Sequence, residues 1–226
     1  MNNPTPTGKS VRSRANPSPR YRELLEQYRR MHEEGEQHQK LLPEDTYPGK
    51  SLNEHVAPIK ALIVRDGAKS LLDYGAGKGL QYSRTDLILP DGSECPSIQR
   101  YWGIDRLVCY DPGHLPFSKL PEGQFDGVIC TDVLEHCDQA DVQWIIEEMF
   151  GYSRRFVYAN IACYPAQAIL PNGENAHCTI KPPEWWQAKI DEALRRHPAI
   201  RYTFVLDIRK PKPFGRKSKQ KVILEN

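Results

Sequence analysis

Three glycines directly follow a short apolar segment, and this arrangement constrains the fold more than any other part of the chain. The segment is Ser70-Leu-Leu-Asp-Tyr74, and the glycines are Gly75, Gly77 and Gly79. Such a pattern predicts a buried β-strand that enters a tight turn, because glycine adopts backbone conformations that other residues disfavour. Glycine also lets a ligand approach the main chain closely, so the turn is a candidate binding site.

Strands and helices are predicted to alternate along the rest of the chain. Short apolar segments at 107–110, 125–130 and 155–161 predict further buried parallel strands, and the segments 202–208 and 221–224 predict two closing strands. Apolar residues at helical spacing predict helices at 21–34, at 52–65, after Asp138, and from Pro183 to about Arg196. A break or an offset at Pro58 stays open for the second of these helices. This alternation predicts an α/β fold whose sheet is covered on both faces and whose binding crevice lies at the carboxyl ends of the strands.

The net charge of +2 hides an uneven distribution. Residues 1–20 hold four basic residues and no acidic one, and residues 209–226 hold seven basic residues against Glu225. The chain between them has 20 basic and 28 acidic residues. Residues 1–20 lack apolar side chains to bury and are predicted to be a flexible basic arm, which leaves a single domain over 21–226.

No feature of the sequence indicates a membrane or an oxidising compartment. No apolar run approaches the roughly 18 residues of a spanning helix, and the N-terminus lacks the apolar core of a signal peptide. The six cysteines are scattered and form no CxxC pair. We therefore expect reduced thiols, no metal site and a cytoplasmic location.

The spacing of the glycine turn separates three kinds of nucleotide-binding loop. A Walker loop needs glycine where this chain has Leu72, and serine or threonine where it has Gly79. A dinucleotide fingerprint needs glycine where the chain has Leu80. The remaining pattern, acidic-x-Gly-x-Gly-x-Gly starting at Asp73, resembles motif I of class I methyltransferases that depend on S-adenosylmethionine (SAM).

Two later segments resemble the same family. Phe125-Asp-Gly-Val-Ile-Cys-Thr-Asp-Val-Leu-Glu-His136 is similar to the family's fourth strand and the VLEH helix start after it. Asn175-Ala-His-Cys-Thr-Ile-Lys-Pro-Pro-Glu-Trp185 is similar to the loop after its fifth strand. The resemblance implies a methyltransferase with a Rossmann-like three-layer sandwich. Its features would be a sheet of the seven-stranded type, a C-terminal antiparallel hairpin, and an N-terminal helical lid at about 21–65 that includes Tyr47 and Gly49.

One part of the sheet is predicted to depart from this pattern. Only 13 residues lie between Asp111 and Phe125, too few for a helix and a full third strand. Residues 81–104 look like an insertion near the same place. The third-strand region is therefore predicted to be reduced.

The resemblance also implies which residues hold SAM. In such enzymes an acidic residue after the second strand binds both ribose hydroxyls, since a carboxylate offers two acceptor oxygens. Asp111 fits this role but lies 32 residues beyond Gly79, so Asp105 stays open as an alternative. Asp73 lies near the methionine amino group or only caps the turn. The candidate cofactor residues are Asp73, Gly75, Gly77, Gly79, Asp111, Thr131 and Asp132.

Methyl transfer needs alignment of donor and acceptor and, for a protonated acceptor, a base. The catalytic candidates are His177 and Asp132, with a lid-stabilising role open for the histidine and a helix-cap role open for the aspartate. His136, in the VLEH segment, is expected to be structural. The residues expected to line the acceptor pocket are Asn160, Tyr164 and Glu174.

The sequence does not identify the acceptor. If the strand at 202–208 is parallel to the others, the basic loop at 209–221 emerges at the crevice. Such a loop favours an anionic acceptor, either a small molecule or a nucleic acid, although a solvated loop without a partner has the same pattern. Two alternatives stay open: a nucleic-acid-binding protein, and a SAM-binding regulatory protein, each with this fold and without turnover.

Overall fold

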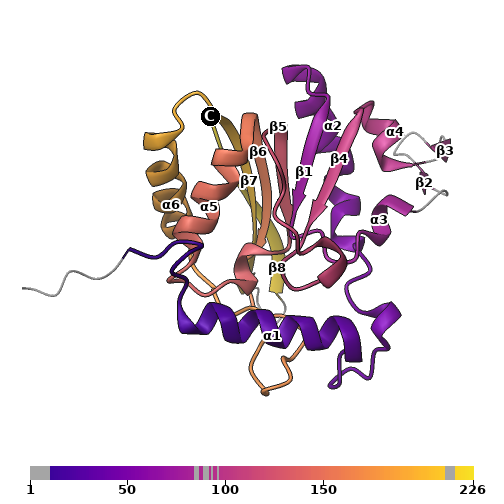
Figure 1. The fold of residues 1–226 in the computed structure, drawn as a ribbon, viewed down its shortest axis with the longest axis vertical. Coiled ribbons are helices and arrows are strands. Elements are labelled where there is room, and N and C mark those ends of the chain that lie inside the picture. The colour runs from indigo at the N-terminus through magenta and orange to yellow at the C-terminus, as the bar shows by residue number, and fades with distance from the viewer. Residues whose placement is uncertain (1–10, 84–86, 89–91, 93, 96, 212–216) are drawn as a thin grey trace, which may run out of the picture.

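A six-stranded sheet runs through the centre of the fold (Figure 1). The computed structural model describes residues 11–83, 87, 88, 92, 94, 95, 97–211 and 217–226. The strands of the sheet are β1 (Ser70–Tyr74), β4 (Arg106–Tyr110), β5 (Phe125–Thr131), β6 (Ser153–Ala162), β7 (Arg201–Pro211) and β8 (Lys217–Glu225). Their order is β4-β1-β5-β6-β7-β8, and every neighbouring pair is parallel except β7 and β8. The predicted α/β fold with a C-terminal antiparallel hairpin is confirmed.

Helices cover both faces of this sheet. On one face lie α2 (Val56–Asp66) and α4 (Ile98–Trp102), and on the other lie α5 (Val142–Tyr152) and α6 (Pro183–Arg196). The remaining helices are α1 (Pro19–Glu34) and the short α3 (Leu80–Ser83). The short 3₁₀ helices are η1 (Pro43–Asp45), η2 (Lys50–His55), η3 (Leu115–Phe117) and η4 (Leu134–His136). None of the helices among the described residues is long and apolar enough to cross a membrane.

The two layers arise from the alternation of side chains along each strand. In β1, Leu71 packs into the core under α2 and α4, whereas Leu72 packs into the core under α5 and α6. Successive strand residues point to opposite faces, so a central strand needs apolar residues at every position. Both leucines are fully buried, which is why the continuous apolar segment predicted this strand correctly.

The sheet has six described strands, fewer than the seven-stranded type that the resemblance implies. β4 is an edge strand, and the chain between β4 and β5 contains only η3 among its regular elements. The predicted reduction of the third-strand region is therefore confirmed. The predicted insertion at 81–104 contains a separate two-stranded ribbon of β2 (Leu87–Ile88) and β3 (Glu94–Cys95), followed by α4.

The strand order reverses direction between β1 and β5. The chain moves outward from β1 to β4 and then returns to the other side of β1 with β5. In open α/β sheets this reversal opens a crevice at the carboxyl ends of the two strands. Helix α1 lies across this edge of the sheet (Figure 1). Because β7 is parallel to β6, its carboxyl end at Pro211 lies at the same edge.

The segment before α1 packs against the body of the protein. The Arg14 guanidinium is paired with Glu148 of α5 and donates a 3.0 Å hydrogen bond to the Tyr74 hydroxyl. The backbone N–H of Ser18 donates a 2.9 Å hydrogen bond to Asp141. The sequence predicts a flexible arm over residues 1–20, but 14–18 make these specific contacts, and residues 1–10 of the predicted arm lie outside the described residues.

Candidate functional site

A cavity of about 800 Å³ lies at the carboxyl edge of the sheet. Its floor is formed by the ends of β1, β4 and β5, and its cover by α1 and the segment from 36 to 52. Of the predicted cofactor residues, the lining includes Asp73, Gly75, Gly77, Asp111, Thr131 and Asp132. Tyr47 and Gly49, predicted as lid residues, also line it. Residues that were predicted from the ends of three separate strands therefore line one cavity.

Asp111 connects the end of β4 to the glycine turn. One carboxylate oxygen accepts a 2.8 Å hydrogen bond from the Gly77 N–H, and the other accepts a 2.8 Å hydrogen bond from the Gly113 N–H. Burial raises the pKa of this carboxyl although both amides favour its ionised form. Asp105, the open alternative, is exposed and precedes β4, at the opposite end of the strand from the cavity.

Asp73 is buried at the end of β1. One of its oxygens accepts hydrogen bonds from the Tyr82 hydroxyl at 2.7 Å and from the Gln81 amide at 3.2 Å. Burial raises the pKa of this carboxyl to about 7, and the nearby charge of Asp111 acts in the same direction. Its second oxygen makes no hydrogen bond among these contacts, and the residue lines the cavity.

The three glycines of the turn have different surroundings, and all have positive φ angles. A Cβ atom at Gly77 would meet only Tyr47 at 3.8 Å and His32 at 3.9 Å, both cavity residues. A Cβ at Gly75 would lie 2.7 Å from Cγ1 of Val133. A Cβ at Gly79 would lie 3.0 Å from the Phe117 ring, and this glycine is outside the described cavity lining. Gly77 is therefore the one of the three whose missing side chain leaves space on the cavity side.

His32 is a cavity residue that sequence analysis missed. It is 8% exposed, its ring lies 4.8 Å from that of Tyr47 and 4.9 Å from that of His114, and its Nδ1 has no hydrogen-bond partner among the described groups. Burial lowers its pKa to about 3. The sequence did contain a signal, because His32 follows Tyr28 by four residues and so puts a polar ring on the apolar face of α1.

A second group of side chains lies at the other side of the cavity. One donor atom from each of Asp132, His136 and His177 lies within 4.8 Å of the other two. The two histidine rings pack edge to face, with centroids 4.7 Å apart. Asp132 and His136 line the cavity, whereas His177 is buried behind them. Asp132 has a φ of 61°, and a non-glycine residue in this region often marks a functional site.

Both rings are oriented by backbone carbonyls. Nδ1 of His177 lies 2.6 Å from the Tyr164 carbonyl, and Nδ1 of His136 lies 3.0 Å from the Ala176 carbonyl. A carbonyl only accepts hydrogen bonds, so Nδ1 of His177 is the protonated nitrogen. Nδ1 of His136 also lies 2.9 Å from the Tyr28 hydroxyl, and it is protonated when that hydroxyl gives its own proton to the carbonyl. The Tyr28 hydroxyl of α1 also donates to the Ala176 carbonyl, at 2.7 Å. In neutral imidazoles this arrangement leaves Nε2 of each ring free to accept a proton or to bind a cation.

The electrostatics of this group are dominated by burial. Burial lowers the pKa of His136 to about 4, and the neighbouring His177 adds to the effect. Glu135, next in the chain, is fully buried, and burial together with the charge of Asp132 raises the pKa of its carboxyl well above the usual value. One Glu135 oxygen accepts the Ala162 N–H, and the other has no hydrogen-bond partner among the described groups.

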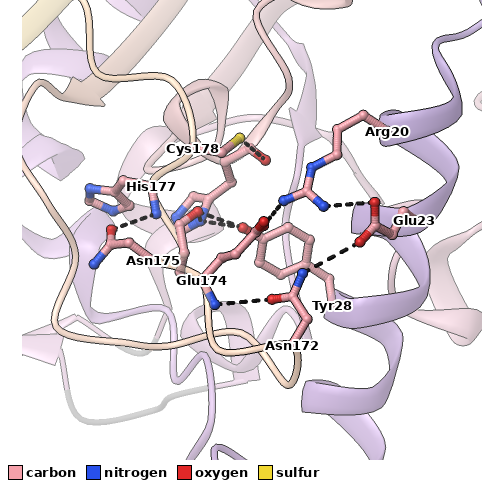
Figure 2. A network of polar contacts seen from close by, with 10 residues as sticks. Arg20, Glu23, Tyr28, Asn172, Glu174, Asn175, His177 and Cys178 are labelled. Atoms are coloured by element: carbon pink, nitrogen blue, oxygen red, sulfur yellow. Dashed lines mark hydrogen bonds and ion pairs between the residues drawn. The ribbon is translucent and has the colours of Figure 1, made fainter.

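The three predicted acceptor residues lie outside the described cavity lining. Asn160 is buried in the sheet, where its amide donates to the Val205 carbonyl at 3.1 Å and to Asp207 at 3.2 Å. Glu174 is exposed and paired with Arg20 of α1 (Figure 2). Tyr164 orients His177 through its carbonyl, so it contributes to the site only indirectly.

Figure 2 shows how α1 is tied to the loop that carries His177. Arg20 lies between Glu23 of its own helix, at 2.7 Å, and Glu174 of the loop. Asn172 donates a 3.4 Å hydrogen bond to Glu23. These contacts hold the helix that covers the cavity against the loop that positions the histidine.

The basic segment predicted as a loop over 209–221 is mostly strand, because β7 continues to Pro211 and β8 begins at Lys217, and both strands pass beside this part of the site. The Arg209 guanidinium lies 3.9 Å from the centroid of the Tyr164 ring. Lys219 pairs with Asp207 at 3.4 Å, and Lys221 pairs with Glu54 at 3.1 Å. Part of the predicted basic charge is thus compensated within the protein, and Lys212 and Arg216 lie outside the described residues.

Comparisons with known proteins provide no family for this chain. No protein-family model matches it, and a search of curated proteins finds no match. A chain in a solved structure titled "DhpI-SAH complex structure" shares 14% sequence identity with it, over 91% of this chain and 79% of that one, with a TM-score of 0.30. At that TM-score the likeness supports no inference, so the function has to be argued from the residues of the cavity.

Proposed function

We propose that the protein is a SAM-dependent methyltransferase. The contact that carries this proposal is the hydrogen bond from the Gly77 N–H to Asp111, because it joins the glycine turn after β1 to the acidic residue after β4 in one cavity wall. A carboxylate bonded by amides at this place retains lone pairs that can accept hydrogen bonds from a ribose diol. Asp73, whose second oxygen has no hydrogen-bond donor among the described residues, fits a cationic amino group.

The residues present fit a cofactor of this size and chemistry. The cavity volume of about 800 Å³ lies in the ~300–1,000 Å³ range of small-molecule sites. The open space beside Gly77 admits a ligand against the backbone. The apolar side chains of α1, among them Leu24 and Met31, exclude water from the side facing the sheet edge.

When bound, SAM supplies a methyl carbon activated by a sulfonium, which accepts a lone pair from the acceptor while the carbon–sulfur electrons stay on sulfur. The protein then has to orient the acceptor and, for a protonated one, to remove its proton. Of the predicted catalytic residues, Asp132 lines the cavity, and His177 is buried beside it, outside the described lining. The Tyr164 carbonyl keeps the proton of His177 on Nδ1, which leaves Nε2 to accept one.

For the acceptor we propose an anionic molecule, either a small molecule or a nucleic acid. Support comes from the parallel direction of β7, which puts the start of the basic loop at the crevice edge, beside Tyr164. Incubation of the protein with methyl-labelled SAM and cell-extract fractions tests this. We expect label on a species that nuclease or phosphatase removes, and label removed only by protease would contradict it.

Calorimetry with SAM and S-adenosylhomocysteine tests the proposed cofactor directly. We expect each to bind with one site per chain. The absence of binding to both compounds would reject the methyltransferase and leave a nucleic-acid-binding protein as the alternative. Binding to both without any turnover in the extract assay would favour the regulatory alternative.

Cofactor affinity is expected to rise with pH through about 7. The carboxylate of Asp73 attracts a cationic amino group only when ionised, and its pKa in the folded protein is about 7. Raising the pH from 6 to 8 should therefore strengthen SAM binding about tenfold. Calorimetry across this range measures the effect.

The variant Asp73→Asn is the control for this pH dependence. The asparagine side chain has a similar shape but cannot ionise, so the affinity of this variant for SAM should not change between pH 6 and 8. The same carboxyl should make the unliganded protein less stable as pH rises from about 4 to 7, because the folded state holds the proton more tightly than the unfolded chain. A wild-type affinity that does not change with pH would contradict the role of Asp73.

A further inference from the structure

The group Asp132, His136 and His177 has the composition and geometry of a metal-binding site. Two imidazoles and one carboxylate offer donor atoms within 4.8 Å of one another. Ions bound at about 2.1 Å from each donor bring the donors to about 3–4 Å from one another. Asp132 is exposed, so its side chain has room to rotate toward the two rings.

The hydrogen bonds around the two histidines are those of metal ligands. A metal-binding histidine donates its other ring N–H to a carbonyl or carboxylate, which fixes the tautomer and the ring orientation. His136 donates to the Ala176 carbonyl and His177 to the Tyr164 carbonyl. Both rings therefore direct Nε2 away from these carbonyls, and the contacts of the described residues include no hydrogen bond from either Nε2.

The charges beside the group provide an independent observation. Glu135 is fully buried, and one of its oxygens has no hydrogen-bond partner among the described groups. A buried carboxyl oxygen without a partner costs free energy, and a cation bound beside it offsets part of that cost.

We propose that Asp132, His136 and His177 bind a divalent first-row transition ion, from Mn²⁺ to Zn²⁺. Imidazole nitrogens favour such ions over Mg²⁺ and Ca²⁺, which prefer oxygen ligands only. Three protein ligands leave coordination positions open, and Asp132 and His136 line the cavity. The open positions therefore face the space where the acceptor has to lie. The sequence did not predict this site because the ligands include no cysteine and come from two segments, with His136 and His177 lying 41 residues apart.

This inference rests on the proposed function and changes the role of His177 within it. The ion holds the acceptor through an oxygen atom and lowers the pKa of an acceptor hydroxyl, so that the proton leaves to solvent before the methyl group is transferred. Nε2 of His177 is then a ligand and not the base. The acceptor class that fits is a hydroxyl compound that carries further anionic groups.

Titration of the tag-free, chelator-treated full chain with MnCl₂, followed by electron paramagnetic resonance, tests the site. Bound Mn²⁺ loses the six-line signal of the free ion, so the readout does not depend on activity. We expect one ion per chain, displaced by ZnCl₂ and not by equal MgCl₂. We expect His177→Ala and Asp132→Asn to weaken Mn²⁺ binding at least about tenfold. Asparagine tolerates the positive φ of position 132, so the second variant should fold normally.

Matched controls are His38→Ala and Asp105→Asn, which change exposed residues outside the group. Both should bind Mn²⁺ as the wild type does. Equal binding by all four variants, or no binding by the wild type, would overturn the metal site. S-adenosylhomocysteine calorimetry on the same samples separates the two proposals. Cofactor binding without Mn²⁺ binding rejects only the metal site, and Mn²⁺ binding without cofactor binding rejects only the methyltransferase.

Discussion

Replacing Gly127 by alanine is expected to lower the free energy of unfolding by about 3 kcal/mol. Gly127 lies in β5, between the neighbouring strands β1 and β6. A Cβ atom there would lie 2.7 Å from Cδ2 of Leu71 and 2.7 Å from Cε1 of Phe156, two side chains that are fully buried. Neither can move without displacing its own core neighbours, so the strain spreads into the packing of the sheet. Thermal unfolding should show a midpoint about 6–12 °C lower.

The variant Gly151→Ala is the matched control for this effect. Gly151 lies in the last turn of α5, and a Cβ there would meet only His197, at 3.9 Å. Alanine restricts the unfolded chain and favours the helix, so this variant should be about 0.5 kcal/mol more stable than the wild type. Equal stability of Gly127→Ala and the wild type would contradict the described packing between β1 and β6.

The order of the elements could be predicted from the sequence because each central strand needs apolar residues on both faces. Ser70–Tyr74 and Phe125–Thr131 show this pattern, and both form strands. The predicted helix at 52–65 is divided instead into η2 and α2, with the break at His55 and Val56. That break depends on tertiary contacts, such as the 2.6 Å approach of the His55 ring to the Tyr158 hydroxyl, which no local pattern contains.

The N-terminal segment also makes tertiary contacts that its local sequence does not predict. Its composition predicts no core of its own. Arg14 instead lies 5.3 Å from the centroid of the Trp144 ring and pairs with Glu148, both on α5. An ion pair of this kind joins residues more than 130 positions apart, so it cannot be read from the spacing within the segment.

The cavity could be predicted in part because parallel strands end at one edge. Asp73, Asp111 and Thr131 each end or follow a strand, so the topology brings them together. Asn160 also lies near a strand end, but its side-chain amide donates hydrogen bonds inside the sheet to Val205 and Asp207. Which strand-end side chains face the cavity depends on sheet pairing, and this information appears only with the structure.

Replacing Gly77 by valine is expected to weaken binding of S-adenosylhomocysteine about 100-fold or more. Gly77 has a φ of 57° and lines the cavity beside Asp111, which accepts its N–H. A valine side chain would extend toward Tyr47 and His32 and fill the space in which the proposed ligand contacts the backbone. Calorimetry measures the change in affinity, and circular dichroism checks that the variant is folded.

The control for this variant is Gly123→Val, because strain and steric exclusion have to be separated. Gly123 has a similar φ of 76°, but a Cβ there would have nothing within 4 Å. Both variants place a branched side chain in the left-handed region, at a cost of about 1–2 kcal/mol in stability. Only Gly77→Val blocks the cavity, so only this variant should lose cofactor binding. Equal affinities in the two variants would mean that the ligand does not lie against the glycine turn, and the proposed cofactor position would then be wrong.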